Sequence, residues 1–457
     1  MTDTPLKAWI CPVCGYIHYG PEPPDECPIC GTLKNEFEPY TVPQPAQPAP
    51  APAQALKVVI AGAGIAGVSA AEAVSQAAPQ AEITLLSREP DLPYYRLSLT
   101  RYLAGEVGAA ELDLHPEGWY AEACIRLLRG VELSAIDLDQ HAALLGDGRR
   151  LEFDKLILTV GSRSFVPPLP GVERQGVTVL RTRRDADFIL QAAGPGRKCV
   201  CIGGGILGLE TAAALACSGA EVTVLENMAW LLPRQLNPRA GALFQARLAA
   251  LGIAVRTSAK VRDLAGDDAV RGVALEDGTL LPADLVIISA GVRPNLDAAR
   301  QAGLAVNQGI LVDAAMQTSH PDVYAAGDVA EHQGVLYGTW PPAQIQGTVA
   351  GSNAAGQSAE FTSLPRSNSL KVVGIDLFSI GTTSAAAETE RVVDAELDGN
   401  YYCFVFRDKA LVGSILLGDS TLSPKVKKII EERIDCAALL LQNPDVQEIL
   451  AFADGAQ

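Results

Sequence analysis

Four cysteines near the start of the chain have the spacing of a metal site. They form two halves with the same pattern, Cys-Pro-x-Cys-Gly, one at Cys11 and Cys14 and the other at Cys27 and Cys30. Two such tight turns can place four thiolates at the corners of a tetrahedron, a geometry that suits iron or zinc. The glycine after each second cysteine lets the backbone turn back, so that amide N–H groups can point at the sulfurs. The sequence therefore predicts a four-cysteine metal centre.

Two glycine-rich loops with the spacing GxGxxG lie further along the chain. Each follows an apolar run expected as a parallel strand, at residues 58–61 and 199–202, and precedes a helix of small residues and a second strand. The first glycine makes the tight turn, the second lets the backbone approach a pyrophosphate, and the third packs the helix against the strand. The helix N-terminus then offers free N–H groups to the phosphate. The predicted dinucleotide-binding residues are Gly62, Gly64, Ile65, Ala66 and Gly67 in the first loop, and Gly203, Gly205, Ile206, Leu207 and Gly208 in the second.

An acidic residue follows the second strand of each unit, Glu89 in the first and Glu226 in the second. A carboxylate at this point can accept hydrogen bonds from ribose hydroxyls, and it repels a 2′-phosphate. Asn227 and Met228 come after Glu226, with no arginine to receive that phosphate. The sequence therefore favours NADH over NADPH.

The length and composition fit a globular protein of several domains. A chain of 457 residues exceeds a single core, so two to four domains are expected. The net charge of −17 argues against nucleic acid as a partner, because a phosphate-binding protein carries a basic face. Residues 1–7 are polar with no apolar run after them, so no secretory signal is expected. The apolar stretch at 199–220 is interrupted by Glu210, which predicts a strand, turn and helix and no membrane span.

Ten cysteines without a secretory signal indicate the cytoplasm as the location. The six outside the metal pattern share no spacing and are expected as buried single thiols: Cys124, Cys199, Cys201, Cys217, Cys403 and Cys436. The histidines share no metal-type spacing either, and each is expected at the surface or in the core: His18, His115, His141, His320 and His332.

The N-terminal segment resembles the short rubredoxin-like domain found at the end of rubrerythrins. The likeness covers residues 8–40 and includes Trp9, Tyr16 and Phe37 besides the two cysteine turns. It implies one iron that cycles between the ferric and ferrous states. Ordinary rubredoxins have far more residues between the two cysteine pairs, and a zinc ribbon uses the same ligand spacing, so zinc stays the alternative.

From about residue 56 to residue 356 the chain resembles the FAD-dependent pyridine nucleotide oxidoreductases, and within them the NADH:rubredoxin reductases. The likeness rests on the two loops and on five further segments, at residues 92–101, 159–162, 289–295, 323–329 and 340–347. It implies that FAD binds at the first loop and NADH at the second. The further cofactor-binding residues that it implies are Arg96, Arg101, Thr159, Gly161, Gly291, Asp328, Trp340 and Ala343.

Arg101 is also the residue for which the resemblance implies a catalytic role. In related reductases a lysine commonly stands close to flavin N5 where this chain has Arg101. Arg101 is therefore expected to keep the positive charge that stabilises reduced flavin.

Redox-active protein sulfur is missing from the matching region. Disulfide reductases carry a CxxxxC just after the first βαβ unit, and none occurs between Gly67 and Gly105. NADH peroxidases and oxidases of this superfamily place one cysteine against the flavin, where residues 97–100 hold no thiol. Electrons from NADH are thus expected to pass through FAD to the chain's own rubredoxin-like domain, and on to a redox protein such as rubrerythrin or a flavodiiron protein.

Two alternatives stay open for the route of the electrons. In the first, the N-terminal domain is a structural zinc ribbon that only docks a separate partner, and the flavoprotein reduces that partner. In the second, the flavoprotein feeds a ferredoxin or a nitrite reductase subunit.

Residues 363–457 resemble the C-terminal domain of rubredoxin and nitrite reductase flavoproteins, which packs near the flavin and in some relatives forms dimers, so a homodimer is open. Strands are expected at 370–377, 401–407 and 410–417, followed by helix. Three lysines, Lys425, Lys427 and Lys428, are expected on a solvated helix face, with a partner's acidic surface as the alternative.

The predicted fold class is α/β, with two Rossmann-like three-layer dinucleotide-binding domains, a small N-terminal rubredoxin-like metal domain and an α+β C-terminal domain. The prolines of residues 42–55 are expected to hold an extended linker. The expected boundaries are 1–41 for the metal domain, 42–55 for the Pro/Ala linker, 56–170 and 296–362 for the FAD domain, 171–295 for the NAD domain and 363–457 for the C-terminal domain.

Overall fold

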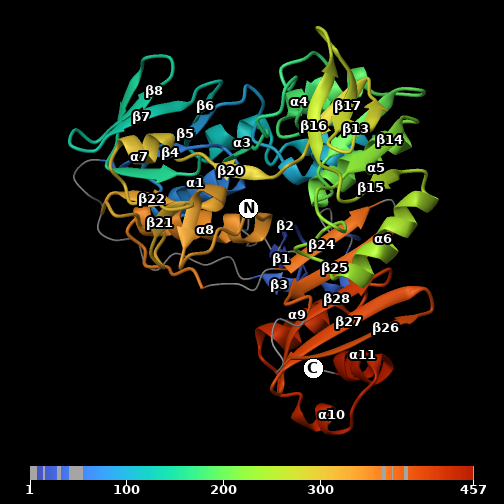
Figure 1. The fold of residues 1–457 in the computed structure, drawn as a ribbon. Helices are drawn as coiled ribbons and strands as arrows, with labels where there is room; N and C mark the ends of the chain where they lie inside the picture. The colour runs from blue at the N-terminus through green and yellow to red at the C-terminus, as the bar shows by residue number, and fades with distance from the viewer. Residues whose placement is uncertain are drawn as a thin grey trace.

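The computed structural model describes residues 8–13, 16–27, 32–40, 55–362, 367–372, 374–384 and 390–455. Cys14, Cys30 and almost all of the predicted linker lie outside these residues. The predicted fold class is confirmed, with two parallel sheets covered by helices, an antiparallel C-terminal sheet and a small N-terminal sheet (Figure 1).

The first parallel sheet carries the first glycine loop. Its strands, in spatial order, are β22 (Val323–Ala325), β10 (Lys155–Leu158), β4 (Lys57–Ala61), β5 (Glu82–Ser87) and β6 (Ile125–Arg129). Helix α1 (Ile65–Ala77) packs on α8 (Trp340–Ala354) so closely that a side chain at Gly347 would lie 2.2 Å from the carbonyl oxygen of Ala66. The sheet needs apolar residues throughout because both of its faces are buried, one against α1 and α8 and the other against a small antiparallel sheet within residues 133–152.

The second parallel sheet repeats this design around the second glycine loop. Its strands, in spatial order, are β12 (Val177–Thr178), β19 (Leu285–Ile288), β13 (Lys198–Ile202), β14 (Glu221–Leu225) and β15 (Ala254–Arg256). Helix α5 (Ile206–Cys217) follows β13 directly. Both α1 and α5 begin inside their glycine motifs, directly after the second glycine.

The C-terminal sheet separates two hydrophobic cores. Its antiparallel strands, in spatial order, are β24 (Ser367–Val372), β25 (Ile375–Gly381), β28 (Ala410–Leu417), β27 (Asn400–Arg407) and β26 (Glu390–Leu397). Along β27, Tyr401, Cys403 and Val405 pack into the core of the second parallel sheet. Tyr402, Phe404 and Phe406 point to the other face, where α9 (Ser423–Glu431), α11 (Val446–Gly455) and the N-terminal domain pack. This alternation is the period of two that a strand imposes on its side chains.

The N-terminal domain is a three-stranded antiparallel sheet in the order β2 (Ile17–Tyr19), β1 (Ala8–Ile10) and β3 (Glu38–Tyr40). In Figure 1 it lies between the dinucleotide-binding domains and the C-terminal sheet. Its apolar residues join the C-terminal core, since Cys11, Val13, Cys27 and Phe37 belong to one cluster with residues of β25, β27, β28 and α9.

Small sheets and short helices complete the chain. The remaining strands are β7 (Leu133–Asp137), β8 (Ala142–Leu145), β9 (Arg150–Glu152), β11 (Ser162–Ser164), β16 (Val261–Gly266), β17 (Val270–Leu275), β18 (Leu280–Pro282), β20 (Val292–Pro294), β21 (Ile310–Val312) and β23 (Ala330–His332). The remaining helices are η1 (Lys34–Glu36), η2 (Arg96–Ser98), α2 (Leu99–Leu103), η3 (Ala109–Leu112), α3 (Glu117–Glu122), α4 (Arg183–Ala192), α6 (Pro238–Ala250), α7 (Asp297–Gln301), η4 (Gly327–Val329) and α10 (Ala437–Leu441). No helix among the described residues combines the length and the apolar run that crossing a bilayer requires.

Candidate functional site

One large cavity connects the two glycine loops with the N-terminal domain. Its volume is about 3100 Å³, and its walls come from both parallel sheets, from β25 and α9, and from the first cysteine turn. The predicted site residues that line it are Gly62, Gly64, Ile65, Ala66, Glu89, Arg96, Thr159, Gly161, Asp328, Trp340, Ala343, Gly203, Gly205, Ile206, Leu207, Glu226, Gly291 and Cys11. Gly67 and Gly208 lie behind the loops, where they contact backbone.

The first loop has the geometry of a phosphate cradle. Gly62 has a φ of +112°, and a side chain there would lie 2.2 Å from the Thr159 carbonyl oxygen. A side chain at Gly67 would lie 1.8 Å from the carbonyl oxygen of Gly62, whereas one at Gly64 would meet nothing within 4 Å. The first and third glycines are therefore required by packing, and the second leaves open space on the cavity side.

The second loop repeats this geometry. A side chain at Gly203 would lie 2.2 Å from the carbonyl oxygen of Ser289, and one at Gly208 would lie 2.1 Å from the carbonyl oxygen of Gly203. A side chain at Gly205 would meet nothing within 4 Å. Gly64 and Gly205 are the N-caps of α1 and α5, and neither helix has a side-chain cap. The first N–H groups of each helix thus remain available to an anion. Both loops fit the pyrophosphate of a dinucleotide.

Glu89, predicted to hold a ribose, is bound to neighbouring side chains. Its carboxylate accepts a hydrogen bond of 2.6 Å from the Tyr94 hydroxyl and pairs with Arg96 at 2.6 Å. Arg96 also donates to the backbone carbonyl of Arg181. Burial alone lowers the pKa of Arg96, but its contacts with Tyr94 and Glu89 outweigh that effect and raise it. The network holds an Arg96–Glu89 ion pair in the cavity wall.

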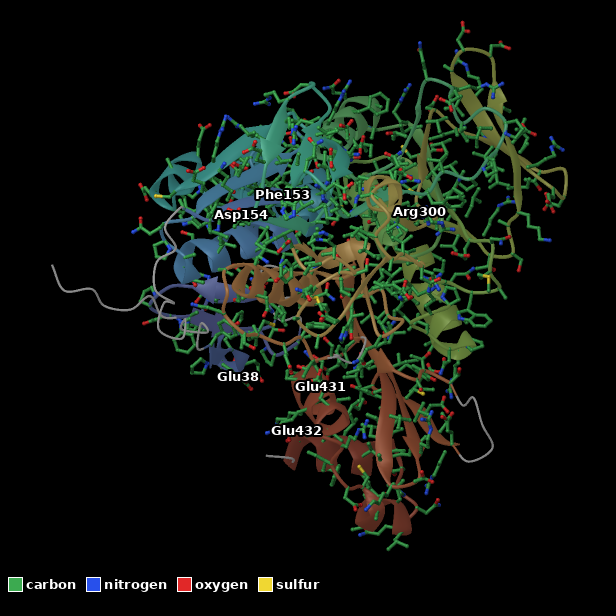
Figure 2. All side chains as sticks on the ribbon, turned by 90° about the vertical axis from the view of Figure 1, so that its left-hand side faces the viewer. Glu38, Phe153, Asp154, Arg300, Glu431 and Glu432 are labelled. Atoms are coloured by element: carbon green, nitrogen blue, oxygen red, sulfur yellow. The ribbon has the colours of Figure 1, made fainter. Side chains whose placement is uncertain are left out.

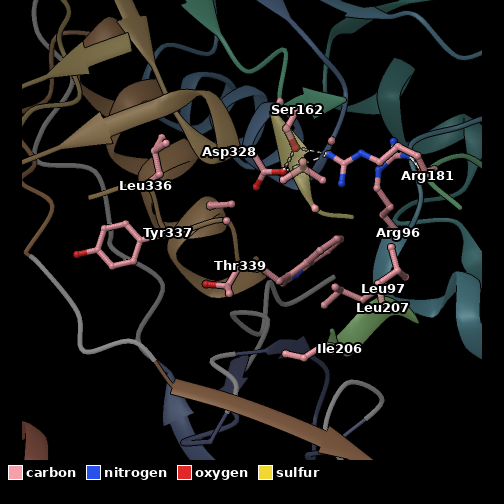
Figure 3. A pocket seen from close by; sticks show the side chains of 18 of the residues that line it. Arg96, Leu97, Ser162, Arg181, Ile206, Leu207, Asp328, Leu336, Tyr337 and Thr339 are labelled. Atoms are coloured by element: carbon pink, nitrogen blue, oxygen red, sulfur yellow. Dashed lines mark hydrogen bonds and ion pairs between the residues drawn. The ribbon is translucent and has the colours of Figure 1, made fainter. Parts of the chain in front are cut away.

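A second polar cluster joins residues from three distant segments (Figure 3). The Ser162 hydroxyl donates to Asp328 at 2.7 Å, and Arg181 contacts Asp328 at 3.1 Å and Ser162 at 3.0 Å. Burial lowers the pKa of Arg181, and Asp328 opposes this. Sequence reasoning found Asp328 and missed Arg181, because 147 residues separate the two. The cluster can orient hydroxyl and phosphate groups of a bound dinucleotide.

Glu226 is hydrogen-bonded to the backbone of the second glycine loop. Its carboxylate accepts hydrogen bonds from the backbone N–H of Gly204 at 2.8 Å and of Met228 at 2.7 Å. Each carboxylate oxygen has further lone pairs for a ribose hydroxyl. Arg234 and Lys260 line the same cavity, so cationic groups are present there although none follows Glu226 directly in the sequence.

Arg101, the predicted catalytic residue, is not among the described residues that line the cavity. Its side chain is 39% exposed, and its Nε donates to Glu106 at 3.0 Å. The geometry therefore does not support the predicted role beside the flavin. Residue 101 lies on the exposed side of the short helix α2, because its neighbours Thr100 and Leu99 take the inward positions.

Glu210 is an ionisable residue of the cavity wall that contacts α2, and it was not selected from the sequence. It lies on α5, lines the cavity and accepts a hydrogen bond of 3.1 Å from the Thr100 hydroxyl. Burial raises its pKa to about 7, against the smaller opposite effect of the Thr100 hydrogen bond. A carboxyl group with this pKa can hold or release a proton near neutral pH.

Aromatic side chains connect the cavity wall with the N-terminal domain. Trp340 and Tyr95 are stacked with ring centroids 5.3 Å apart, and Tyr95 lies 6.1 Å from Tyr16 of the N-terminal domain. Trp340 was predicted to back the flavin, whereas the contact with Tyr16 could not be foreseen.

The two cysteine turns have matching backbone geometry. The N–H of Cys11 donates to the Tyr16 carbonyl at 2.8 Å, and the N–H of Cys27 donates to the Thr32 carbonyl at 2.7 Å. Cys11 and Cys27 are buried, with exposed fractions of 0% and 3%. Equivalent turns with buried first cysteines fit a tetrahedral thiolate site, although the other two predicted ligands, Cys14 and Cys30, lie outside the described residues.

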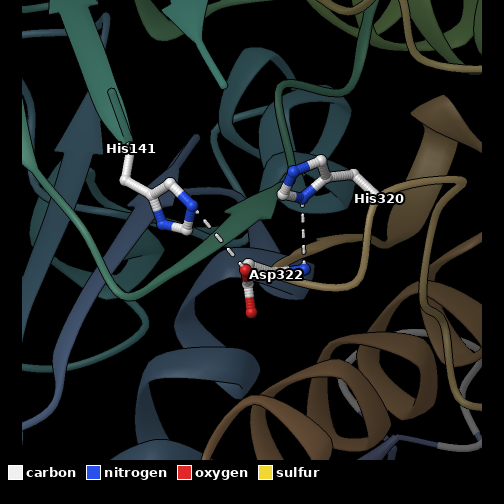
Figure 4. A group of neighbouring side chains, drawn as sticks. All are labelled: His141, His320 and Asp322. Carbon is white, nitrogen blue, oxygen red and sulfur yellow. Dashed lines mark hydrogen bonds and ion pairs between the residues drawn. The ribbon is translucent and has the colours of Figure 1, made fainter. Parts of the chain in front are cut away.

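Three polar side chains form a cluster away from the cavity (Figure 4). Ligand atoms of His141, His320 and Asp322 lie within 4.8 Å of one another, so the structure brings together two histidines that the sequence separates. Lys155 pairs with Asp322 at 2.5 Å, and the pKa of Asp322 is lowered by that hydrogen bond. Because an ammonium group already neutralises the carboxylate, the cluster is a surface ion-pair network.

The six other cysteines follow the prediction only in part. Cys199, Cys201, Cys403 and Cys436 are buried. Cys124 and Cys217 are exposed because each lies at the C-terminal end of a helix, where the chain turns at the surface.

Comparisons with known proteins match this architecture. Residues 56–347 match the family described as pyridine nucleotide-disulphide oxidoreductase. The chain belongs to this family. Residues 367–434 match the rubredoxin NAD+ reductase C-terminal domain, and residues 9–38 match the rubredoxin-like domain of rubrerythrin. The resemblances inferred from the motifs, and the classification as an oxidoreductase of the rubredoxin reductase family, are confirmed.

The relatives of this pyridine nucleotide-disulphide oxidoreductase differ in length. Nitrite reductase [NAD(P)H] of Bacillus subtilis is 35% identical over 83% of this chain and 48% of its own length. NADH-rubredoxin oxidoreductase of Clostridium acetobutylicum is 31% identical over 82% of this chain and 94% of its own length. The crystal structure of the covalent putidaredoxin reductase–putidaredoxin complex aligns with a TM-score of 0.78 and 29% identity, covering 88% of this chain and 100% of that one. The chain thus spans about half of the nitrite reductase.

Proposed function

We propose that the protein oxidises NADH and passes the electrons, through FAD, to a metal ion held by Cys11, Cys14, Cys27 and Cys30 of the same chain, and from there to an external redox protein. The observation that carries this proposal is the shared cavity, which both glycine loops and the Cys11 turn line. A bound FAD supplies the conversion of a two-electron donor into two one-electron transfers.

The residues of the chain hold and orient the reactants. The helix N-termini behind Gly64 and Gly205 attract the two pyrophosphates. The guanidinium group of Arg96, held by Glu89, lines the same cavity. Glu226 accepts hydrogen bonds from the ribose of the nicotinamide nucleotide and disfavours a 2′-phosphate, which supports NADH as the donor.

Glu210 is a candidate carrier for the proton that the reaction releases. Oxidation of NADH to NAD+ releases one proton for every two electrons. Glu210 lines the cavity with a pKa of about 7, raised by burial, so it can hold that proton transiently before solvent receives it.

Anaerobic titration with NADH tests the route. In iron-loaded wild-type protein, we expect the ferric–thiolate absorption to bleach along with the flavin bands. Cys11→Ser is expected to lose the ferric band and to keep flavin reduction, and Cys124→Ser, which changes an exposed cysteine, serves as the control. A ferric band that persists after the flavin is fully reduced would refute the intramolecular route.

A second candidate function is the reduction of a separate redox protein, with the N-terminal domain as a structural zinc ribbon. The similarity to the reductase of the covalent putidaredoxin reductase–putidaredoxin complex favours it, because that structure joins a reductase to a second protein. Metal analysis of the purified protein separates the two candidates, since zinc adds no visible absorption. Zinc together with rapid reduction of added ferredoxin would support the second candidate.

A further inference from the structure

Lys427 links the C-terminal domain to the first cysteine turn. Its Nζ donates to the backbone carbonyl of Pro12 at 2.7 Å and to that of Val13 at 3.3 Å. The side chain is only 17% exposed, and the nearest acid is Glu431, 3.8 Å away on the same helix. The prediction of a solvated helix face is therefore wrong for Lys427, which points at residues 415 positions earlier in the chain.

The neighbouring lysines of α9 have other surroundings. Lys425 pairs with Asp454 at 2.6 Å, which keeps it on the C-terminal domain itself. Lys428 lines the cavity and carries the same charge one residue along the helix. Three acidic residues that Figure 2 labels, Glu38, Glu431 and Glu432, also line this end of the cavity. The interface between the N-terminal and C-terminal domains is therefore rich in charged groups.

Apolar packing accompanies the Lys427 contact. Val13 and Phe37 are 3% and 7% exposed, and they share a hydrophobic cluster with Phe378, Ile380 and Val426 of the C-terminal domain. The N-terminal domain, expected at residues 1–41, is so small that it buries little apolar surface by itself. The contact with the C-terminal domain therefore supplies much of its core. The docked position is therefore built into the packing of the chain.

We propose that Lys427 is the positioning residue of an internal electron-transfer complex, in which it holds residues 11–13 at the flavin cavity and stabilises the reduced metal centre. This inference rests on the proposed function. The Tyr16–Tyr95–Trp340 contacts define the other edge of the same interface and connect the docked domain to the cavity wall.

The electrostatic part follows from charge. A ferric ion with four thiolates carries one negative charge, and the ferrous form carries two. A buried ammonium group near the turn stabilises the second charge more than the first, so it raises the reduction potential of the centre. One NADH gives two electrons, one proton and NAD+. An iron ion held by these four thiolates would take up one electron at a time, and each electron would leave to an external one-electron acceptor.

The test compares Lys427→Met with the control Lys409→Met, whose ammonium pairs with Asp435 on the C-terminal domain itself, and with the rescue variant Lys427→Arg, all in the full-length protein. Hydrogen–deuterium exchange of residues 8–13 and 375–381 is measured first, in protein loaded with redox-inert zinc. Lys427→Met is expected to increase exchange in both segments at least about tenfold, while the other two variants exchange like wild type. Flavin content and flavin reduction by NADH are expected to stay unchanged in all of them.

The second measurement uses iron-loaded protein and follows the midpoint potential and the rate of ferric bleaching. Lys427→Met is expected to shift the potential downward and to slow bleaching at least about tenfold, and Lys427→Arg is expected to restore both. Unchanged exchange and potential in Lys427→Met would overturn the inference, whether or not wild-type iron is reduced. The two failures are distinguishable. If Lys427→Met increases exchange but the ferric absorption of wild type never bleaches, the docking contact is supported and the electron-transfer role fails together with the proposed function.

Discussion

Replacement of Gly67 by alanine sets two opposing effects against each other. Gly67 lies in α1, and alanine in a helix is about 1 kcal/mol more favourable than glycine. The added methyl group, however, would lie 1.8 Å from the Gly62 carbonyl oxygen and 2.8 Å from the Thr159 hydroxyl. That hydroxyl donates to the same carbonyl at 2.7 Å, so the substitution also disturbs a buried hydrogen bond.

The unfavourable effect is expected to win. Overpacking against backbone costs about 3 kcal/mol, and the disturbed hydrogen bond about 1 kcal/mol more. After the helix gain is subtracted, Gly67→Ala is expected to destabilise the flavin-free protein by about 3 kcal/mol. For a unit of this size that lowers the melting temperature by roughly 6–12 °C, which differential scanning fluorimetry measures directly.

Gly64→Ala is the matched control, because a side chain there meets nothing within 4 Å and the φ of −76° suits any residue. Its stability is expected to stay within about 1 kcal/mol of wild type. Its affinity for FAD, followed by flavin fluorescence, is expected to fall about tenfold because the methyl group occupies the space of the pyrophosphate. The reasoning is refuted if Gly67→Ala melts like wild type, or if Gly64→Ala melts as early as Gly67→Ala.

Two further predictions concern ionisable residues of the cavity. The folded-state pKa of Glu210, about 7, lies above its ordinary value of 4.5, so its contribution to stability is present at low pH and is lost as the pH rises through 7. Glu210→Gln is therefore expected to match the flavin-free wild type near pH 4, below the unfolded-state pKa, and to exceed its free energy of unfolding by about 3 kcal/mol at pH 8, and a constant difference across this range in urea titrations would contradict it. Replacing Glu226 with alanine and Asn227 with arginine removes a carboxylate that accepts backbone hydrogen bonds and adds a cation. The ratio of kcat/KM for NADPH to that for NADH is expected to rise at least about tenfold, and an unchanged ratio would show that Glu226 does not face the ribose.

The sequence was sufficient where the relevant physics is local. The strand, turn and helix around each glycine loop were predictable, because the turns at Gly62 and Gly203 need φ values of +112° and +117°, which glycine adopts most readily. The strands β27 and β28 were predictable from their apolar runs. The three-stranded sheets β7–β9 and β16–β18 were not predicted, because their strands are short and half-exposed and give a weak periodic signal.

Arg101 is the predicted charged residue whose position the geometry does not support. Arg101 was assigned by its place in a motif, yet the turn of α2 directs it to Glu106 and the surface. Arg181, Glu210 and Lys427 carry no local signature, and their roles follow from partners far away in the sequence.

The sequence by itself determined which groups the chain offers: two cysteine turns, two glycine loops and the carboxylates that follow them. These depend on steric rules that act within a few residues, so a short segment encodes them. Only the tertiary structure decided that both loops and the Cys11 turn line one cavity, and that Lys427 reaches across 415 residues to the Pro12 carbonyl. Such contacts depend on the packing of whole domains, in which a side chain's direction is set by neighbours that no local pattern specifies.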